Sequence, residues 1–275
     1  MSKKVKAIVI TGNGTNCEME MAHACRLAGA EVVDIVHLSA LLYGEKTLDD
    51  YHFLNLPGGF LDGDDLGSAK AGANRIQHAG IQGRQEKLYE QFAAFIGQGK
   101  LILGVCNGFQ LLVKLGMLPA IGRRYDEQQV TLTVNDSGRF EDRWVYLRIN
   151  PASPCIFTQG LRGIYLPVRH GEGKLIPRDE EILQILAQKE LIALQYSRED
   201  YGEATMAYPA NPNGSVNGIA GLCDETGRIF GLMPHPEAYL HYTNHPRWTR
   251  EKLPTEGMGL AIFKNAVNFV KSAIL

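Results

Sequence analysis

Cys106 has the sequence context of a reactive cysteine. Residues 101–105 before it are apolar and predict a buried strand, and residues 107–112 after it predict a helix. A sharp turn between the two needs small neighbours, which Gly104 and Gly108 supply. Unpaired amides and the helix dipole at such a turn stabilise a thiolate and, during attack on a carbonyl, an oxyanion. The pattern predicts a nucleophile, although a small buried cysteine has the same spacing.

A second candidate group lies in the sequence Met233-Pro234-His235-Pro236-Glu237. In extended backbone, side chains two residues apart point to the same side, so the Glu237 carboxylate would orient the His235 imidazole. The other imidazole nitrogen would then carry the proton of a thiol and of a leaving amine. The two prolines are expected to keep the segment from becoming helical. An ordinary turn is the alternative for this segment alone, but together with Cys106 it favours a catalytic triad.

Length, composition and charge limit the classes of protein to which the chain can belong. The chain has 275 residues, of which 45% are hydrophobic and 21% charged, so we expect one domain over residues 1–275. A formal net charge of -2 gives no global electrostatic reason to expect a nucleic acid or a membrane as partner. The first apolar run, residues 5–10, has the length of a strand, and no later run approaches a membrane span. We therefore expect a soluble, cytoplasmic protein.

The cysteines indicate a reducing compartment. They are odd in number, widely spaced and free of Cys-x-x-Cys pairs, which argues against a disulfide framework and against a zinc site. His241 and His245 follow Glu237 in a polar loop, but they have no third close ligand. We therefore expect no metal on this chain. The five are Cys17, Cys25, Cys106, Cys155 and Cys223.

The first half of the chain alternates expected strands and helices. This βαβ alternation predicts an α/β fold with an open, mostly parallel sheet and helices on both faces. Ligands collect at the carboxyl ends of such strands, where the Pro57-Gly58-Gly59 turn and Cys106 lie. The expected strands are residues 5–10, 31–37, 51–56 and 100–105, and the expected helices are residues 18–28 and 82–97.

After about residue 120 the pattern changes to alternating segments. Residues 130–134 and 144–149 predict antiparallel ribbons in the second half. The sequence Asp-Glu-Thr-Gly at 224–227 predicts a hairpin turn, and residues 257–272 have helical spacing. Residues 61–83 are rich in glycine and aspartate, and they predict loops with one short helix.

Three blocks together resemble the class I, or triad, glutamine amidotransferases, whose fold is flavodoxin-like. They are Pro57-Gly58-Gly59-Phe60, the Gly-Val-Cys-Asn-Gly-Phe-Gln sequence at 104–110, and Met-Pro-His-Pro-Glu at 233–237. Further blocks at 16–22, 168–173 and 211–215 are most similar to the glutaminase subunits and domains of phosphoribosylformylglycinamidine synthases. The alternative interpretation is a hairpin tip for Asn213-Gly214-Ser215 and a plain turn for His170-Gly171-Glu172-Gly173.

The resemblance implies a role for each site residue. Cys106 would be the nucleophile, His235 the general base and acid, and Glu237 the carboxylate that orients it. The remaining residues would bind the substrate glutamine. Amides around Gly59 and Asn107 would form the oxyanion hole, and Gln110 with the backbone of His170 and Gly171 would hold the glutamine. Gly58 would also belong to the substrate-binding residues.

The resemblance also implies a partner. Glutamine would be hydrolysed to glutamate and ammonia, and a synthetase subunit would use the ammonia to convert formylglycinamide ribonucleotide to formylglycinamidine ribonucleotide in purine biosynthesis. A small accessory subunit belongs to some such assemblies. The chain lacks a phosphate-binding Gly-x-x-x-x-Gly-Lys-Ser/Thr loop, so ATP and magnesium are expected on the synthetase and no cofactor on this chain.

Three alternatives stay open at this stage. The chain could serve another ammonia-using synthetase, because residues 61–66 depart from the Ser-Tyr-Gly-Asp type of sequence usual in the subfamily. It could be a cysteine hydrolase or a chaperone-like protein with the same turn, or a catalytically silent regulatory subunit. An alkylating glutamine analogue would distinguish a silent subunit from an enzyme. In a silent subunit Cys106 is not activated and would react no faster than a surface thiol.

Overall fold

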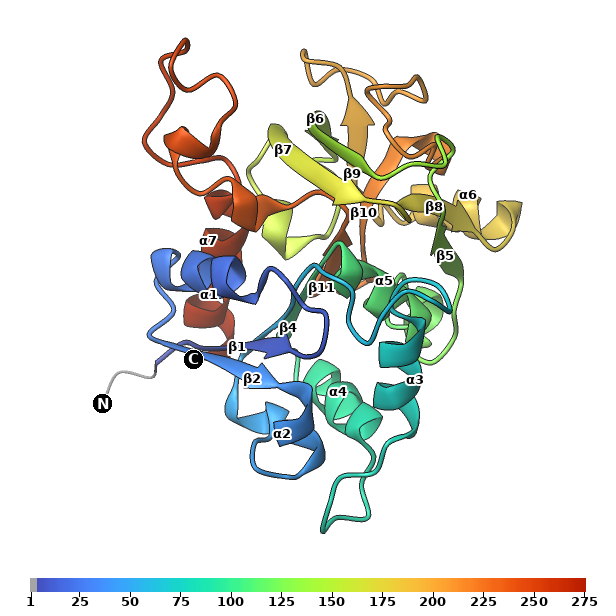
Figure 1. Cartoon of the computed structure of the whole chain (residues 1–275), viewed down its shortest axis with the longest axis vertical. Helices are drawn as coiled ribbons and strands as arrows, with labels where there is room; N and C mark the ends of the chain where they lie inside the picture. The colour runs from blue at the N-terminus through green and yellow to red at the C-terminus, as the bar shows by residue number, and fades with distance from the viewer. Residues whose placement is uncertain (1–3) are drawn as a thin grey trace.

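A nine-stranded sheet forms the centre of the protein in the computed structural model, which describes residues 4–275 (Figure 1). The strands β2, β1, β3, β4 and β11 run parallel to one another, and β10, β9, β6 and β7 continue the sheet in antiparallel pairs. The sequence therefore predicted both halves of the sheet correctly. In sheet order the strands are β2 (Val32–His37), β1 (Lys6–Thr11), β3 (Phe53–Leu56), β4 (Leu101–Val105), β11 (Ile229–Leu232), β10 (Ile219–Cys223), β9 (Ile192–Ser197), β6 (Glu141–Ile149) and β7 (Gly163–His170).

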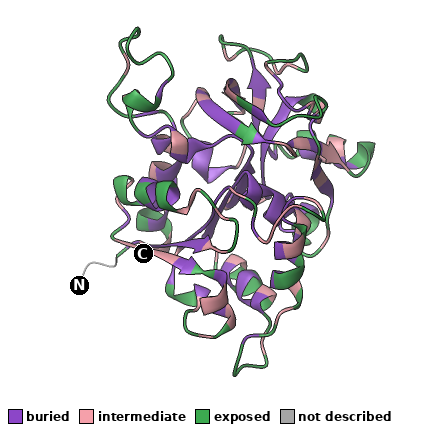
Figure 2. Cartoon of the chain, viewed as in Figure 1, coloured by how far each residue is buried: buried purple, intermediate pink, exposed green. Residues whose placement is uncertain are grey.

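The helices pack in two groups. Helix α1 contacts α7, while α3 contacts α4 and α5, and Figure 1 shows these groups on either side of β1 and β4. Such covering explains why β3, β4 and β11 are buried along their whole length (Figure 2). The helices are α1 (Glu18–Leu27), α2 (Leu38–Leu42), α3 (Lys70–His78), α4 (Leu88–Gly97), α5 (Asn107–Lys114), α6 (Glu180–Gln188) and α7 (Leu260–Phe269), which a π-helical turn, Val270–Ile274, extends.

The second half contains the ribbons that alternation predicted. Strands β10 and β11 form an antiparallel hairpin, and Asp224 at its turn accepts hydrogen bonds from the amides of Arg228 and Ile229. Strand β5 (Val130–Thr133) pairs with β8 (Lys174–Pro177) in a separate two-stranded sheet. Strand β6 is longer than expected, because it begins at Glu141 and pairs with β7 over almost its full length.

The expected helix over residues 82–97 begins only at Leu88. Gly83 adopts a left-handed conformation with φ 75°, and Gly80 forms a β-bridge with Lys87, so this stretch folds as a loop. The Glu90 carboxylate accepts the Lys87 amide at 2.9 Å and so starts the helix there. Apolar spacing does not reveal this change, because it depends on local backbone bonds. Within the described chain, no helix is both long and apolar enough to cross a membrane.

Candidate active site

Cys106 lies at the turn between β4 and α5, in a strained conformation with φ 52° and ψ −105°. A side-chain carbon at Gly104 would lie 2.6 Å from the Gly108 carbonyl oxygen, and one at Gly108 would lie 1.9 Å from the Leu56 carbonyl oxygen. The turn therefore requires both glycines, as the sequence predicted. The Cys106 amide donates to the Leu232 carbonyl at 2.8 Å, which fixes the turn to β11.

His235 and Glu237 form a buried pair beside Cys106. His235 Nδ1 and Glu237 Oε1 are 2.5 Å apart. Burial alone would lower the pKa of His235, but the negative charges of Glu237 and Cys106 raise that pKa well above its ordinary value. His235 Nε2 has no hydrogen-bond partner among the described residues, so it is free to exchange a proton with a nearby group. The structure thus brings together the three residues of the predicted triad.

The local backbone differs from the one expected for this pair. His235 is extended, but Pro236 opens a 3-10 turn, Pro236–Ala238, that contains Glu237. The prediction that the prolines exclude helical backbone is therefore wrong at Pro236, because proline fits the first position of a helical turn. The turn brings the carboxylate back to the imidazole. The two side chains meet for this reason, and not through the alternation of an extended strand.

The turn at Gly58 and Gly59 lies against the same residues. A side-chain carbon on Gly58 would lie 2.7 Å from His235 Cε1 and 3.4 Å from Cys106 Cβ. Gly59 has φ 137°, and a side-chain carbon there would lie 2.6 Å from the Gly14 carbonyl oxygen. Only glycine at both positions lets the backbone approach Cys106 this closely.

Asn107 and Gln110 connect helix α5 to the loops around the site. Asn107 Oδ1 accepts the Leu61 amide at 3.0 Å, and Asn107 Nδ2 donates to Gln110 Oε1 at 3.1 Å. Gln110 Nε2 donates to the Glu172 carbonyl at 2.6 Å. Gln110 and Cys106 line one cavity of about 230 Å³. Gln110 is therefore placed to contact a ligand bound at Cys106.

The His170 imidazole is buried and has a polar neighbour at each of its two nitrogens. Its Nδ1 is 3.2 Å from Asn135 Oδ1, and its Nε2 is 3.5 Å from Asn213 Nδ2. Burial, together with the charge of His235, lowers the pKa of His170 to about 3, so the ring stays neutral. His170 and Gly171 both line the cavity at Cys106. The buried ring thus anchors the loop whose backbone borders that cavity.

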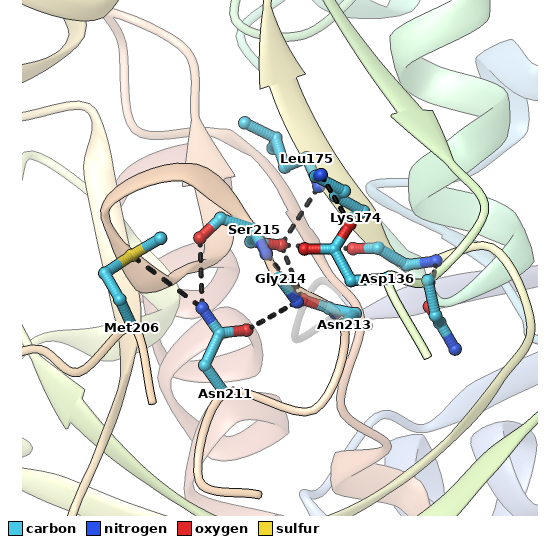
Figure 3. Close-up of polar contacts among 10 residues, drawn as sticks. Asp136, Lys174, Leu175, Met206, Asn211, Asn213, Gly214 and Ser215 are labelled. Atoms are coloured by element: carbon cyan, nitrogen blue, oxygen red, sulfur yellow. Dashed lines mark hydrogen bonds and ion pairs between the residues drawn. The ribbon is translucent and has the colours of Figure 1, made fainter. Parts of the chain in front are cut away.

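The block at 211–215 supports that loop and is not a hairpin tip. Asn211 Nδ2 donates to the Ser215 carbonyl, and Ser215 Oγ donates to Asn213 Oδ1 at 2.7 Å (Figure 3). The Leu175 amide donates in turn to Ser215 Oγ at 3.0 Å. Asn213 Nδ2 also donates to the buried Tyr196 hydroxyl at 2.9 Å. These bonds join the block to β8 and β9, so it acts as a buried polar support.

Sequence reasoning assigned no role to several residues that border the cavity. Cys17 Sγ lies 4.0 Å from His235 Nδ1, and burial raises the pKa of its thiol. Glu20, Arg169 and Glu172 line the cavity as well. The only signal for these residues was their place in two blocks that carry the family resemblance, 16–22 for Cys17 and Glu20 and 168–173 for Arg169 and Glu172.

Cys17, His235 and Glu237 also have the spacing of possible metal ligands. Their ligand atoms lie within 4.8 Å of one another. His235 Nδ1 and Glu237 Oε1 are already bonded directly to each other, so there is no room for an ion between them. We therefore interpret His235 and Glu237 as an acid–base pair and not as metal ligands. All five cysteines are free thiols.

Comparisons with known proteins identify the family of the chain. A family model of the CobB/CobQ-like glutamine amidotransferase domain matches residues 4–270. A phosphoribosylformylglycinamidine synthase subunit PurQ of Dehalococcoides mccartyi is 46% identical over 268 residues, which cover 98% of both chains. The chain is also 40% identical to a phosphoribosylformylglycinamidine synthase of Drosophila melanogaster, over 86% of its own length but 17% of that protein.

A solved structure is similar along the whole chain. It is described as PurLQS from Thermotoga maritima, has 28% sequence identity and a TM-score of 0.69, and the match covers 98% of this chain and 100% of that one. A glutamine amidotransferase from the same organism shares the fold at 14% identity, with a TM-score of 0.54. From the family model and the subunit that is 46% identical, the chain belongs to the glutamine amidotransferases of the CobB/CobQ-like family.

Proposed function

We propose that the chain is the glutaminase subunit of a phosphoribosylformylglycinamidine synthase. The observation that carries the proposal is the cavity in which a strained cysteine, Cys106, meets the buried His235–Glu237 pair. Relatives that are 38–46% identical over nearly their full length carry the name of that subunit. The substrate on this chain is glutamine, and the products are glutamate and ammonia.

The reaction proceeds in two stages through a covalent intermediate. The Cys106 sulfur attacks the side-chain amide carbon of glutamine, and the Gly59 and Asn107 amides stabilise the oxyanion that forms. His235 takes the thiol proton and gives it to the leaving nitrogen, so ammonia departs and a glutamyl thioester remains. In the second stage His235 removes a proton from water, which hydrolyses the thioester to glutamate and restores the thiol. Glu237 holds the imidazole in one tautomer throughout.

The ammonia passes to a synthetase partner. That partner uses ATP and magnesium to convert formylglycinamide ribonucleotide to its amidine, and a small accessory subunit completes the assembly. The similarity to a chain of PurLQS supports a complex of this kind. No phosphate-binding loop occurs in the sequence, which supports ATP on the partner. The free cysteines support the cytoplasm as the location.

Glutamate release, measured with and without the synthetase, tests the proposal. We expect wild-type protein to release glutamate from glutamine in the complex, and Cys106→Ser to release none above background. Cys25→Ser is the matched control, since Cys25 is buried in α1 and does not line the cavity. Turnover that survives in Cys106→Ser would contradict the proposed nucleophile. A wild-type complex that releases no glutamate would contradict the function itself.

A further inference from the structure

The carbonyl of Gly58 is held by two amides of the segment that precedes α1. Asn16 donates to this carbonyl at 3.1 Å and Cys17 at 3.3 Å. In a planar trans peptide, the carbonyl and the following N–H point in opposite directions. The Gly59 N–H therefore points away from Asn16 and Cys17. Within residues 4–275, no group accepts a hydrogen bond from it.

The peptide that carries this N–H lies beside the proposed catalytic residues. The close approach of Gly58 to His235 Cε1 and to Cys106 Cβ places the following peptide beside the nucleophile. Gly59 and Cys106 line the same cavity. When the Cys106 sulfur attacks a carbonyl carbon, the carbonyl oxygen becomes negative, and an unpaired N–H is the kind of group that stabilises it.

Two further hydrogen bonds fix the residues that follow Gly59. The Phe60 amide donates to the Gly14 carbonyl at 2.7 Å, and the Leu61 amide donates to Asn107 Oδ1 at 3.0 Å. The Asn107 side chain is buried and directly follows the nucleophile in the chain. It therefore ties this turn to the helix that presents Cys106.

We propose that the segment Gly14–Cys17 and the Asn107 side chain act together as a brace that aims the Gly59 N–H at the oxyanion formed on Cys106. The inference rests on the proposed glutaminase function and adds Asn107 and Gly14 as positioning residues. Gly14 has φ 90°, and a side-chain carbon there would lie 2.1 Å from the Phe60 carbonyl oxygen. Any larger residue at Gly14 would push the two segments apart.

Two substitutions, Asn107→Ala and Gly14→Ala, test the brace in the complex with the synthetase. We expect kcat for glutamate release to fall about 100-fold or more in both variants, as on loss of an oxyanion donor. KM should change little in Gly14→Ala and should rise in Asn107→Ala, which also loses the donor to Gln110. The second readout is alkylation of Cys106 by iodoacetamide, in which sulfur displaces iodide at a CH2 carbon and no carbonyl oxyanion forms. The alkylation rate should stay close to that of wild type.

Matched controls separate the brace from general damage. Gly83 also has a positive φ, 75°, but an added carbon there meets no atom within 4 Å, so Gly83→Ala should keep the wild-type kcat. Asn107→Asp retains an oxygen that accepts the Leu61 amide but loses the donor to Gln110. It should therefore recover most of the kcat lost in Asn107→Ala, and raise KM.

Two results would contradict the proposed brace. One is an unchanged kcat in both alanine variants. Another is an alkylation rate that falls in step with kcat, because the substitution would then act on the nucleophile or the fold and not on the oxyanion. Absence of glutamate release by the wild-type complex would instead remove the proposed function on which the inference rests.

Discussion

Cys106 combines a reactive position with an unfavourable backbone conformation. Its φ of 52° is costly for any residue with a side chain, and such conformations cost about 1–3 kcal/mol. The surrounding structure maintains it, through Gly104, Gly108 and the bond from the Cys106 amide to Leu232. The protein therefore stores strain at the residue that we propose as nucleophile.

Replacing Cys106 by glycine should abolish activity and relieve the backbone strain at this position. We expect Cys106→Gly to be inactive but more stable than Cys106→Ala by roughly 1 kcal/mol, because glycine adopts a positive φ without strain. Urea denaturation of the two variants, followed by circular dichroism, measures the difference. Equal stabilities, or a less stable glycine variant, would show that the turn is not strained at this residue.

His170 should make the fold sensitive to acid. Its pKa is lowered from 6.5 to about 3 by burial, so between these values the unfolded chain binds more protons than the folded one. The contribution of neutral His170 is complete above pH 6.5 and is lost as the pH falls. The loss is at most about 1.4 kcal/mol per pH unit.

A His170→Gln variant isolates that effect. The glutamine keeps polar atoms for Asn135 and Asn213 but does not titrate, so its free energy of unfolding should fall less between pH 7 and pH 5 than that of wild type. Urea denaturation at both pH values gives the comparison. If both proteins lose the same free energy over this range, His170 is not the acid-sensitive group.

At the scale of the elements, the sequence predicted most of what positions the site. The turn at Cys106 and the hairpin of β10 and β11 follow from apolar runs with glycine or turn residues at their ends, which act locally. The buried support by Asn135 and Asn213 could not be predicted in this way. Their partners are distant in sequence, and only the packed sheet brings them together.

The loop at His170 depends on Asn135 more than on any other side chain. Asn135 Nδ2 donates to the His170 carbonyl at 2.8 Å, and Asn135 Oδ1 accepts the Gly173 amide at 2.9 Å. We expect Asn135→Ala to raise KM for glutamine about ten-fold, the effect of roughly one lost hydrogen bond. Steady-state glutamate release measures it, and Asn150→Ala, whose side chain binds Glu190 away from the cavity, is the control. An unchanged KM would mean that the loop does not hold glutamine.

At the scale of the whole molecule, the proposed function divides the reaction between this chain, which would supply ammonia, and a partner that would consume it. If this division is correct, a complex that carries Cys106→Ser should form no amidine with glutamine but should form it when ammonium chloride is added. Product formation from both nitrogen sources, followed by chromatography, tests the prediction. Failure with ammonium chloride would mean that Cys106 or its neighbours also take part in the synthetase reaction.

The sheet order has one more consequence. The proposed nucleophile follows β4, and its acid–base pair follows β11, which lies directly beside β4 although it comes from the last quarter of the chain. A nascent polypeptide that has completed only β1 to β4 therefore carries the thiol without the imidazole. The proposed site is therefore complete only when the β10–β11 hairpin lies against β4, and a chain that stops before β11 lacks the acid–base pair that glutamine hydrolysis would need.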